Sequence, residues 1–156
     1  MRTLLLFKPD ALQRGLVGSV MARFERKGLK LVALKLVRLD ESSVRELYPH
    51  LVEKPFFPEI VEFMTSAPVV ASVWEGPESV QTVRKLCGPT NGREAPPGTV
   101  RGDFSSSVMC NLVHASETPE DAAREIRIFF DDSEMVSWER DLEKSLLSER
   151  ERPKSL

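Results

Sequence analysis

Short apolar runs are the feature that most constrains how this chain folds. Leu29–Leu39 and Pro68–Trp74 are apolar on both faces, and the first is rich in Leu and Val, which is typical of central strands. Arg2–Lys8 is a shorter buried run that Pro9 stops, and Met109–His114 is the last such run. We therefore expect four strands.

Helical periodicity occupies most of the segments between these runs. Apolar residues recur with helical period from Leu16 to Gly28. The last clear helix spans Pro119–Phe130 and has Thr118 as its N-cap. Further helices are expected at Ser42–Tyr48, Phe56–Ser66 and Pro77–Leu86. This mixture fits an α+β sandwich, most simply the ferredoxin-like arrangement, in which a four-stranded antiparallel sheet has helices on one face. A doubly wound parallel sheet is the competing topology.

Length and charge narrow the class of protein. At 156 residues the chain fits one domain with its own core. The 22 basic and 24 acidic side chains give a net charge of -2 and a pI near 5.8. This charge argues against nonspecific electrostatic binding to nucleic acid. Two cysteines and a short first apolar run favour a reducing, cytoplasmic compartment. No apolar run approaches the roughly 20 residues that span a bilayer, so we expect a soluble protein.

One of only two histidines, His114, stands at the end of an apolar run, directly before the helix that Thr118 begins. An imidazole displayed in this way can accept a phosphoryl group, transfer a proton or bind a metal. Metal ligation is set aside because the other candidate ligands, His50, Cys87 and Cys110, are scattered and form no metal-binding motif. A histidine that merely ends a strand is the alternative that position alone leaves open.

Two charged side chains fall beside apolar helical stripes. Arg84 shares the stripe of the helix expected at 77–86, so its guanidinium either meets an anion or reaches solvent past apolar neighbours. Glu125 lies at the edge of the stripe of the last helix, where it could hold one ring nitrogen of His114. Arg127 flanks the opposite edge of that stripe, so periodicity does not single out Glu125.

The segment Gly88–Val108 has little periodicity and is longer than most connections in a compact domain, which favours a functional or disordered loop. It carries Thr90 and Arg101. The triplet Arg101-Gly102-Asp103 resembles an integrin-binding motif, but three residues recur often by chance and the composition speaks against this reading. Neither a P-loop motif nor a GxGxxG motif is present. If the protein binds a nucleotide, it therefore does so with a fold other than the P-loop or Rossmann fold.

Several short motifs occur in order along most of the chain. They are Lys8-Pro9-Asp10, Gln13-Arg14-Gly15-Leu16-Val17-Gly18, Arg23-Phe24-Glu25, Lys54-Pro55-Phe56-Phe57, Pro68-Val69-Val70, Trp74-Glu75-Gly76, Pro97-Gly98-Thr99-Val100-Arg101-Gly102-Asp103-Phe104 and Asn111-x-x-His114-Ala115-Ser116. Together, from Arg2 to about Trp138, the chain resembles the nucleoside diphosphate kinase family. The resemblance implies a ferredoxin-like α+β core and a two-step transfer of the terminal phosphoryl group of a nucleoside triphosphate to a nucleoside diphosphate.

The resemblance also implies roles for particular residues. His114 matches the phosphorylated histidine, Glu125 the carboxylate that orients it, and Ser116 a residue that supports this contact. The family's phosphate and ribose ligands are matched by Lys8, Tyr48, Arg84, Thr90, Arg101 and Asn111, and Lys8 is also a catalytic candidate. An apolar clamp on the base is matched by Phe56, Ile60 and Val108. Because such a clamp grips the face of the base, we expect broad base specificity.

The expected partners follow from the same resemblance. Mg²⁺ is expected to bridge the nucleotide phosphates without a carboxylate cage of its own. The chain is expected to form a homo-oligomer, either a hexamer or a tetramer, with neither a membrane nor a nucleic acid as partner. The alternative is a catalytically silent relative that senses nucleotides or acts as a scaffold, and the intact catalytic matches favour the enzyme.

Three positions depart from the family pattern. Glu117 stands where an aspartate is usual, His50 where we expect an acid, and Gly92 where a proline is usual. We expect Glu117 to alter the tuning of His114, and Gly92 to loosen the contacts of the long loop and those between subunits. The family-like domain is expected to cover residues 1–138, followed by a charged extension at 139–156. Within the extension, a short amphipathic helix is suggested by Leu142, Leu146 and Leu147.

Overall fold

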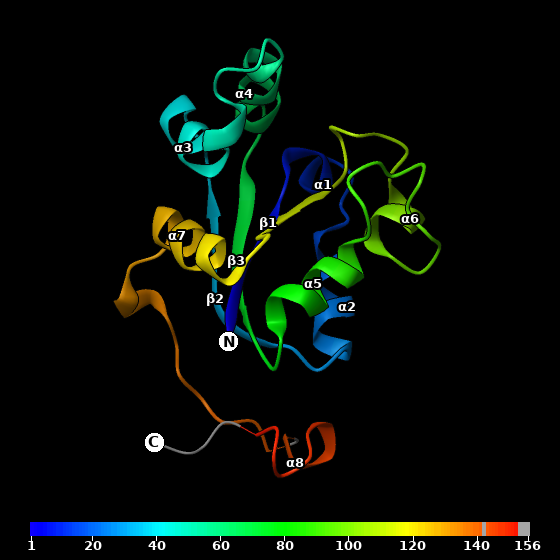
Figure 1. The fold of residues 1–156 in the computed structure, drawn as a ribbon, viewed down its shortest axis with the longest axis vertical. Coiled ribbons are helices and arrows are strands. Elements are labelled where there is room, and N and C mark those ends of the chain that lie inside the picture. The colour runs from blue at the N-terminus through cyan, green and yellow to red at the C-terminus, as the bar shows by residue number, and fades with distance from the viewer. Residues whose placement is uncertain (142, 153–156) are drawn as a thin grey trace.

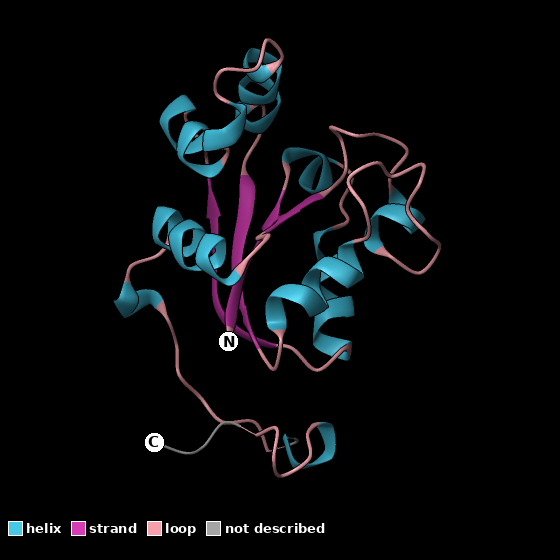
Figure 2. Cartoon of the chain, in the orientation of Figure 1, coloured by secondary structure: helices cyan, strands magenta, loops and turns pink. Residues whose placement is uncertain are grey.

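In the computed structural model, which describes residues 1–141 and 143–152, four strands form one antiparallel sheet (Figures 1 and 2). The strands are β1 (Arg2–Phe7), β2 (Lys30–Val37), β3 (Val69–Glu75) and β4 (Val113–Ala115), in the spatial order β2-β3-β1-β4. The predicted α+β class and ferredoxin-like sheet are confirmed. A doubly wound parallel sheet is excluded, because every neighbouring pair of strands is antiparallel.

Helices fill the connections between the strands and follow the last strand. They are α1 (Pro9–Gln13), α2 (Val17–Arg26), α3 (Glu41–Leu47), α4 (Phe57–Thr65), α5 (Ser79–Cys87), α6 (Val100–Phe104), α7 (Pro119–Phe129) and α8 (Glu143–Leu146), with 3-10 turns at Pro49–Leu51 and Asp132–Glu134. The five helices predicted before residue 131 form close to their expected ends, whereas the short α1 and α6 were not indicated by periodicity. The Thr118 hydroxyl accepts the Asp121 N–H at 3.0 Å, which confirms the predicted N-cap.

Helices cover both faces of the sheet (Figure 1). Leu4 and Leu6 of β1 belong to the core on one face, where α3, α4 and α7 pack. Leu5 and Phe7 belong to the core on the other face, where α2 and α5 pack. The expectation of helices on one face only is therefore wrong. A strand that is apolar at successive residues needs apolar cover on both sides, and β1 is such a strand.

The strand β2 lies at the edge of the sheet, although its sequence predicted a central strand. Leu34 and Leu36 are 50% and 65% exposed there. An apolar pattern indicates whether the two faces of a strand are buried, but it does not indicate whether neighbouring strands pair with both of its edges. The prediction of a central position for β2 was wrong for this reason.

The last strand is shorter than predicted. Only the end of the run Met109–His114 joins β4, which continues to Ala115. Leu112 has a φ of 72°, in the left-handed region, and its N–H donates to Asp10 Oδ2 at 3.1 Å. This residue interrupts the extended backbone, so the segment before it turns away from the sheet.

The segment after α7 follows the outer edge of β2, from residue 136 into the extension that begins at residue 139. The Val136 N–H donates to the Val32 carbonyl at 2.8 Å, and Arg140 Nη2 donates to the Gly28 carbonyl at 2.7 Å. The chain then reaches α8 below the sheet in Figure 1, where Leu146 packs over Gly28. A short helix in the extension was predicted, but Leu142 lies outside the described residues. Among the described helices, none has the length and apolar character needed to cross a membrane.

Candidate active site

A cavity of about 800 Å³ opens where the ends of β1 and β4 meet α5, α7 and the segment between α5 and β4. Its walls include eight of the side chains predicted for the site: Lys8, Tyr48, Arg84, Thr90, Arg101, Asn111, His114 and Glu125. These residues come from distant parts of the sequence, so the fold gathers them.

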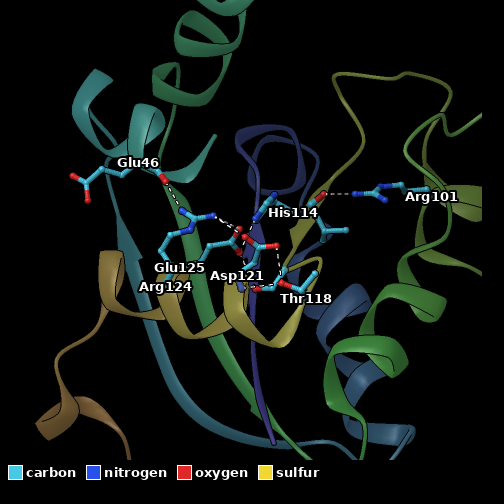
Figure 3. A network of polar contacts seen from close by, with 9 residues as sticks. Glu46, Arg101, His114, Thr118, Asp121, Arg124 and Glu125 are labelled. Atoms are coloured by element: carbon cyan, nitrogen blue, oxygen red, sulfur yellow. Dashed lines mark hydrogen bonds and ion pairs between the residues drawn. The ribbon is translucent and has the colours of Figure 1, made fainter. Parts of the chain in front are cut away.

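The His114 ring is fixed by two neighbours. Its Nε2 atom lies 3.0 Å from Glu125 Oε2, and its side chain is only 15% exposed (Figure 3). The ring of Tyr48 meets it at 84°, with ring centroids 5.1 Å apart. Because a carboxylate only accepts, the neutral imidazole carries its proton on Nε2, and the lone pair is then on Nδ1. No hydrogen bond to Nδ1 is found among residues 1–141 and 143–152.

Ser116 and Glu125 form a buried hydrogen-bonded pair next to His114. Ser116 Oγ donates to the same Glu125 Oε2 atom at 2.7 Å. Both side chains are buried, with Ser116 0% and Glu125 3% exposed. The choice that periodicity left open between Glu125 and Arg127 is settled by the tertiary structure, because Arg127 is exposed.

Cationic side chains line the same cavity as His114. Lys8 Nζ donates to Asn111 Oδ1 at 2.7 Å, and Asn111 Nδ2 donates to the Thr90 carbonyl at 2.9 Å. Burial, assisted by the nearby Arg101 guanidinium, lowers the pKa of Lys8 to about 8. An ammonium that has lost its water in this way gains strongly from an incoming anion.

Arg101 is held by three backbone carbonyls. Its guanidinium donates to the carbonyls of Asn111 at 3.2 Å, Gly88 at 2.7 Å and Val113 at 2.6 Å. Burial lowers the pKa of this side chain. The three bonds tie α6 to the end of α5 and to β4, and they fix a positive charge in the cavity wall.

Arg84 is an accessible cation of the site. Its side chain is 46% exposed, and Nη2 lies 3.7 Å from Glu117 Oε1. Both side chains line the cavity, so the guanidinium reaches the cavity instead of only passing apolar neighbours. Beneath it, burial raises the pKa of Cys87 to about 12, so this thiol stays protonated at neutral pH.

The comparison with known proteins agrees with this geometry. A family model described as nucleoside diphosphate kinase matches residues 1–135. The chain belongs to the nucleoside diphosphate kinase family. The resemblance carried by the sequence motifs is thereby confirmed.

Family members from distant organisms are similar over most of this chain. A nucleoside diphosphate kinase of Staphylothermus marinus is 53% identical over 137 residues, which cover 88% of this chain and 97% of the relative. Human nucleoside diphosphate kinase 3 is 53% identical over 138 residues, covering 88% of this chain and 82% of the relative.

Solved structures of the family share the fold. The enzyme of Halobacterium salinarum in complex with CDP matches with a TM-score of 0.92 and 44% identity, covering 95% of this chain and 99% of that one. A transition-state mimic of the Borrelia burgdorferi enzyme, with bound vanadate and ADP, matches with a TM-score of 0.87 and 41% identity, covering 93% and 95%.

Three side chains that the family resemblance implied for the base do not line the cavity. Phe56 and Val108 are 44% and 52% exposed, and Ile60 packs against the core on the α4 side. Ser116 is also absent from the cavity wall, because it lies behind Glu125.

Two polar residues of α7 were missed at the sequence level. Asp121 and Arg124 line the cavity beside Glu125 (Figure 3). Arg124 Nη2 lies 3.2 Å from Asp121 Oδ1. Their spacing of three residues, which pairs opposite charges on a helix, was the available signal. Of the noted departures from the family pattern, His50 and Glu117 also line the cavity.

Proposed function

We propose that His114 carries the phosphoryl group when this nucleoside diphosphate kinase transfers the terminal phosphoryl group of a nucleoside triphosphate to a nucleoside diphosphate. The observation that carries the proposal is the arrangement of the ring: Nε2 faces Glu125, and Nδ1 is left for the substrate in the cavity. The relatives bound to CDP and to vanadate with ADP support a nucleotide as the ligand.

In the first step, the lone pair of His114 Nδ1 attacks the terminal phosphorus of the triphosphate. The N–P bond forms, the bond from phosphorus to the bridging oxygen breaks, and the diphosphate leaves with the bridging electrons. The Nε2 proton stays between the ring and Glu125, whose negative charge stabilises the positive charge that develops on the imidazole.

In the second step, a terminal phosphate oxygen of the acceptor diphosphate attacks the same phosphorus from the opposite side. The N–P bond breaks, and the ring recovers its Nδ1 lone pair. Both displacements use one nitrogen and one cavity, so donor and acceptor nucleotides bind in turn. This order corresponds to ping-pong kinetics.

The cations of the cavity suit the charges of this reaction. Arg84 and Arg101 carry guanidinium groups that can donate to phosphate oxygens, and Lys8 adds an ammonium. Thr90 and Asn111 supply polar groups on the same wall, and Tyr48 packs against His114. Phosphoryl transfer asks mainly for alignment and for positive charge around the moving oxygens.

Mg²⁺ belongs to the substrate in this proposal. Among the described residues, no three His, Cys, Asp or Glu side chains gather where they would hold a metal ion. The cavity carboxylates already have partners: Glu125 accepts from Ser116, Asp121 from Thr118, and Glu117 faces Arg84. These residues fit an ion that arrives bound to the nucleotide phosphates, where it neutralises charge.

The base is assigned to apolar residues beyond the cavity, the exposed Phe56 and Val108 and the partly buried Ile60. A contact with the face of the base does not read its edge, so purine and pyrimidine nucleotides should both be substrates. A preference above about 10³ for one base would contradict this assignment, because it requires hydrogen bonds to the base edge.

We also assign a homo-oligomer, a hexamer or a tetramer, to this protein. Large apolar side chains are exposed on β2 and on the segment after α7 that lies beside it: Leu34, Leu36, Val136 and Trp138. Exposed apolar groups in this number beside a sheet edge favour burial against another copy.

We further assign the protein to the cytoplasm, where free thiols such as those of Cys87 and Cys110 stay reduced. We also propose that the extension at 139–156 is separate from the domain that the family shares.

Labelling tests the proposal directly. The protein is incubated with Mg²⁺ and a nucleoside triphosphate that carries a labelled terminal phosphate, and mass spectrometry locates any acid-labile phosphate. We expect the label on His114 and its loss on addition of a diphosphate. The His114→Ala variant should take up no label. Full transfer activity in that variant would rule out a mechanism through His114. Absence of transfer by the native protein would favour the alternative, a catalytically silent member of the family.

A further inference from the structure

The two oxygens of the Glu125 carboxylate are not supported equally. Oε2 accepts from His114 Nε2 at 3.0 Å and from Ser116 Oγ at 2.7 Å. Oε1 has one partner among the described residues, Arg124 Nη2 at 3.4 Å. Because Glu125 is 3% exposed, solvent does little to hold this second oxygen. Arg124 is therefore the described residue that holds this second oxygen, and it adds to the restraint that His114 and Ser116 place on the carboxylate.

Arg124 also contacts a residue of its own helix, α7, and a residue of one other element, α3 (Figure 3). Nη2 also contacts Asp121 Oδ1 at 3.2 Å, within α7. Nη1 donates to the backbone carbonyl of Glu46, in α3, at 2.6 Å. One planar guanidinium therefore connects the helix that carries Glu125 to the end of a second helix.

The residue at the C-cap of that second helix is the other neighbour of His114. Tyr48 follows Glu46 by two residues and meets the imidazole ring edge-on, with centroids 5.1 Å apart. The contacts that orient His114 thus come from Glu125 in α7 and from Tyr48 at the C-cap of α3, and Arg124 joins these two helices.

We propose that Arg124 is a positioning residue for phosphoryl transfer: by bridging the Glu46 carbonyl and the Glu125 carboxylate it keeps the His114 proton on Nε2 and the lone pair on Nδ1. The inference rests on the proposed role of His114. Arg124 acts through Glu125 and is not assigned a contact with the substrate.

The test uses the full-length protein and two readouts. The first is the ¹⁵N NMR signature of the histidine ring at a pH where the imidazole is neutral, which reports the nitrogen that carries the proton. With only two histidines in the chain, His50→Gln identifies the His114 signals. The native protein should show the Nε2–H form, and Arg124→Gln should show a mixture of the two forms.

The second readout is the steady-state rate of phosphoryl transfer, which gives kcat and KM. In Arg124→Gln we expect kcat to fall about tenfold with KM within about twofold of the native value, because alignment is lost and substrate contacts are kept. In Arg124→Ala, added guanidinium ion should restore part of the rate, since the side chain is 41% exposed and its place is open to solvent. Arg124→Lys should fall between the native protein and Arg124→Gln, because one ammonium cannot bridge both acceptors.

Arg127→Gln is the matched control. This arginine lies on the same helix, is exposed, and makes no hydrogen bond or ion pair with the described part of the chain. It should match the native protein in both readouts. A raised KM in Arg124→Gln with an unchanged NMR signature would identify a phosphate ligand and overturn the inference. A lower melting temperature with unchanged kcat and signature would overturn it as well.

Failure of this inference can be told apart from failure of the proposed function. The proton position is measured on the free protein without nucleotide, so it does not depend on turnover. Labelling of His114 in the native protein, together with a native-like signature in Arg124→Gln, would keep the proposed function and reject the role of Arg124.

Discussion

Lys8 Nζ lies 2.7 Å from Asn111 Oδ1, although 103 positions separate the two residues in the sequence. The contact links the residue that follows β1 to the segment that precedes β4. It leaves the Lys8 ammonium buried, with a pKa lowered to about 8 by desolvation and by the nearby Arg101. The free protein therefore loses this positive charge at a lower pH than an exposed lysine does.

This lowered pKa predicts a pH dependence of nucleotide binding. Bound phosphate stabilises the ammonium, so binding takes up a proton once the pH exceeds about 8. We expect KM to rise by up to about tenfold per pH unit between pH 8 and pH 10. Lys8→Arg, which stays charged, should show a flatter profile. Steady-state kinetics would contradict the prediction if the native KM were constant over this range.

Ser116→Ala should slow phosphoryl transfer. The change removes the 2.7 Å bond to Glu125 Oε2, which leaves the carboxylate with the His114 contact alone on that oxygen. We expect kcat to fall about tenfold with little change in KM, and the free energy of unfolding to fall by about 1–3 kcal/mol. Rapid-quench measurement of the phosphoenzyme reports the first value. Ser106→Ala, at an exposed position, should have no effect, and an equal loss there would count against the prediction.

Arg101→Lys should destabilise the fold as well as the site. A lysine keeps the charge but cannot donate to the carbonyls of Gly88, Asn111 and Val113 together. We expect the free energy of unfolding to fall by about 2–4 kcal/mol, since buried acceptors lose their donors. Urea denaturation measures the change. The exposed Arg93→Lys is the control, and a stability for Arg101→Lys equal to that of the control would be inconsistent with a bridging role.

Gly92→Ala should be destabilising. A Cβ at this buried position would lie 2.4 Å from the Ser105 carbonyl oxygen, and the Gly92 N–H donates to the Ser107 carbonyl at 3.1 Å. We expect a loss of about 1–3 kcal/mol in the free energy of unfolding. Gly18→Ala, in α2 with open space around it, should instead stabilise by about 0.5–1 kcal/mol. Calorimetry that gave the two variants the same sign would refute this contrast.

Leu36→Asp should weaken self-association. This side chain is 65% exposed on the edge strand β2, and an ionised carboxylate would have to lose its water to enter an apolar interface. Sedimentation velocity should show smaller species for Leu36→Asp than for the native chain. Gln81→Asp, at an exposed position of α5, should sediment like the native chain. Native-sized particles in both variants would place the interface elsewhere.

Local sequence patterns predicted the elements that depend on neighbouring residues. The helical period from Leu16 to Gly28 and the N-cap at Thr118 are confirmed, because the backbone hydrogen bonds of a helix join residues close in sequence. The motif around His114 identified the family, since it occurs in order with several other motifs.

The tertiary structure alone decided how these elements meet. Periodicity describes the faces of an element, so it could not place β2 at the sheet edge or helices on both sides. It could not choose Glu125 over Arg127, because either edge of the α7 stripe could have faced β4. The site requires side chains from distant segments to lie within about 3 Å of one another, and only the packing of the whole core sets such distances.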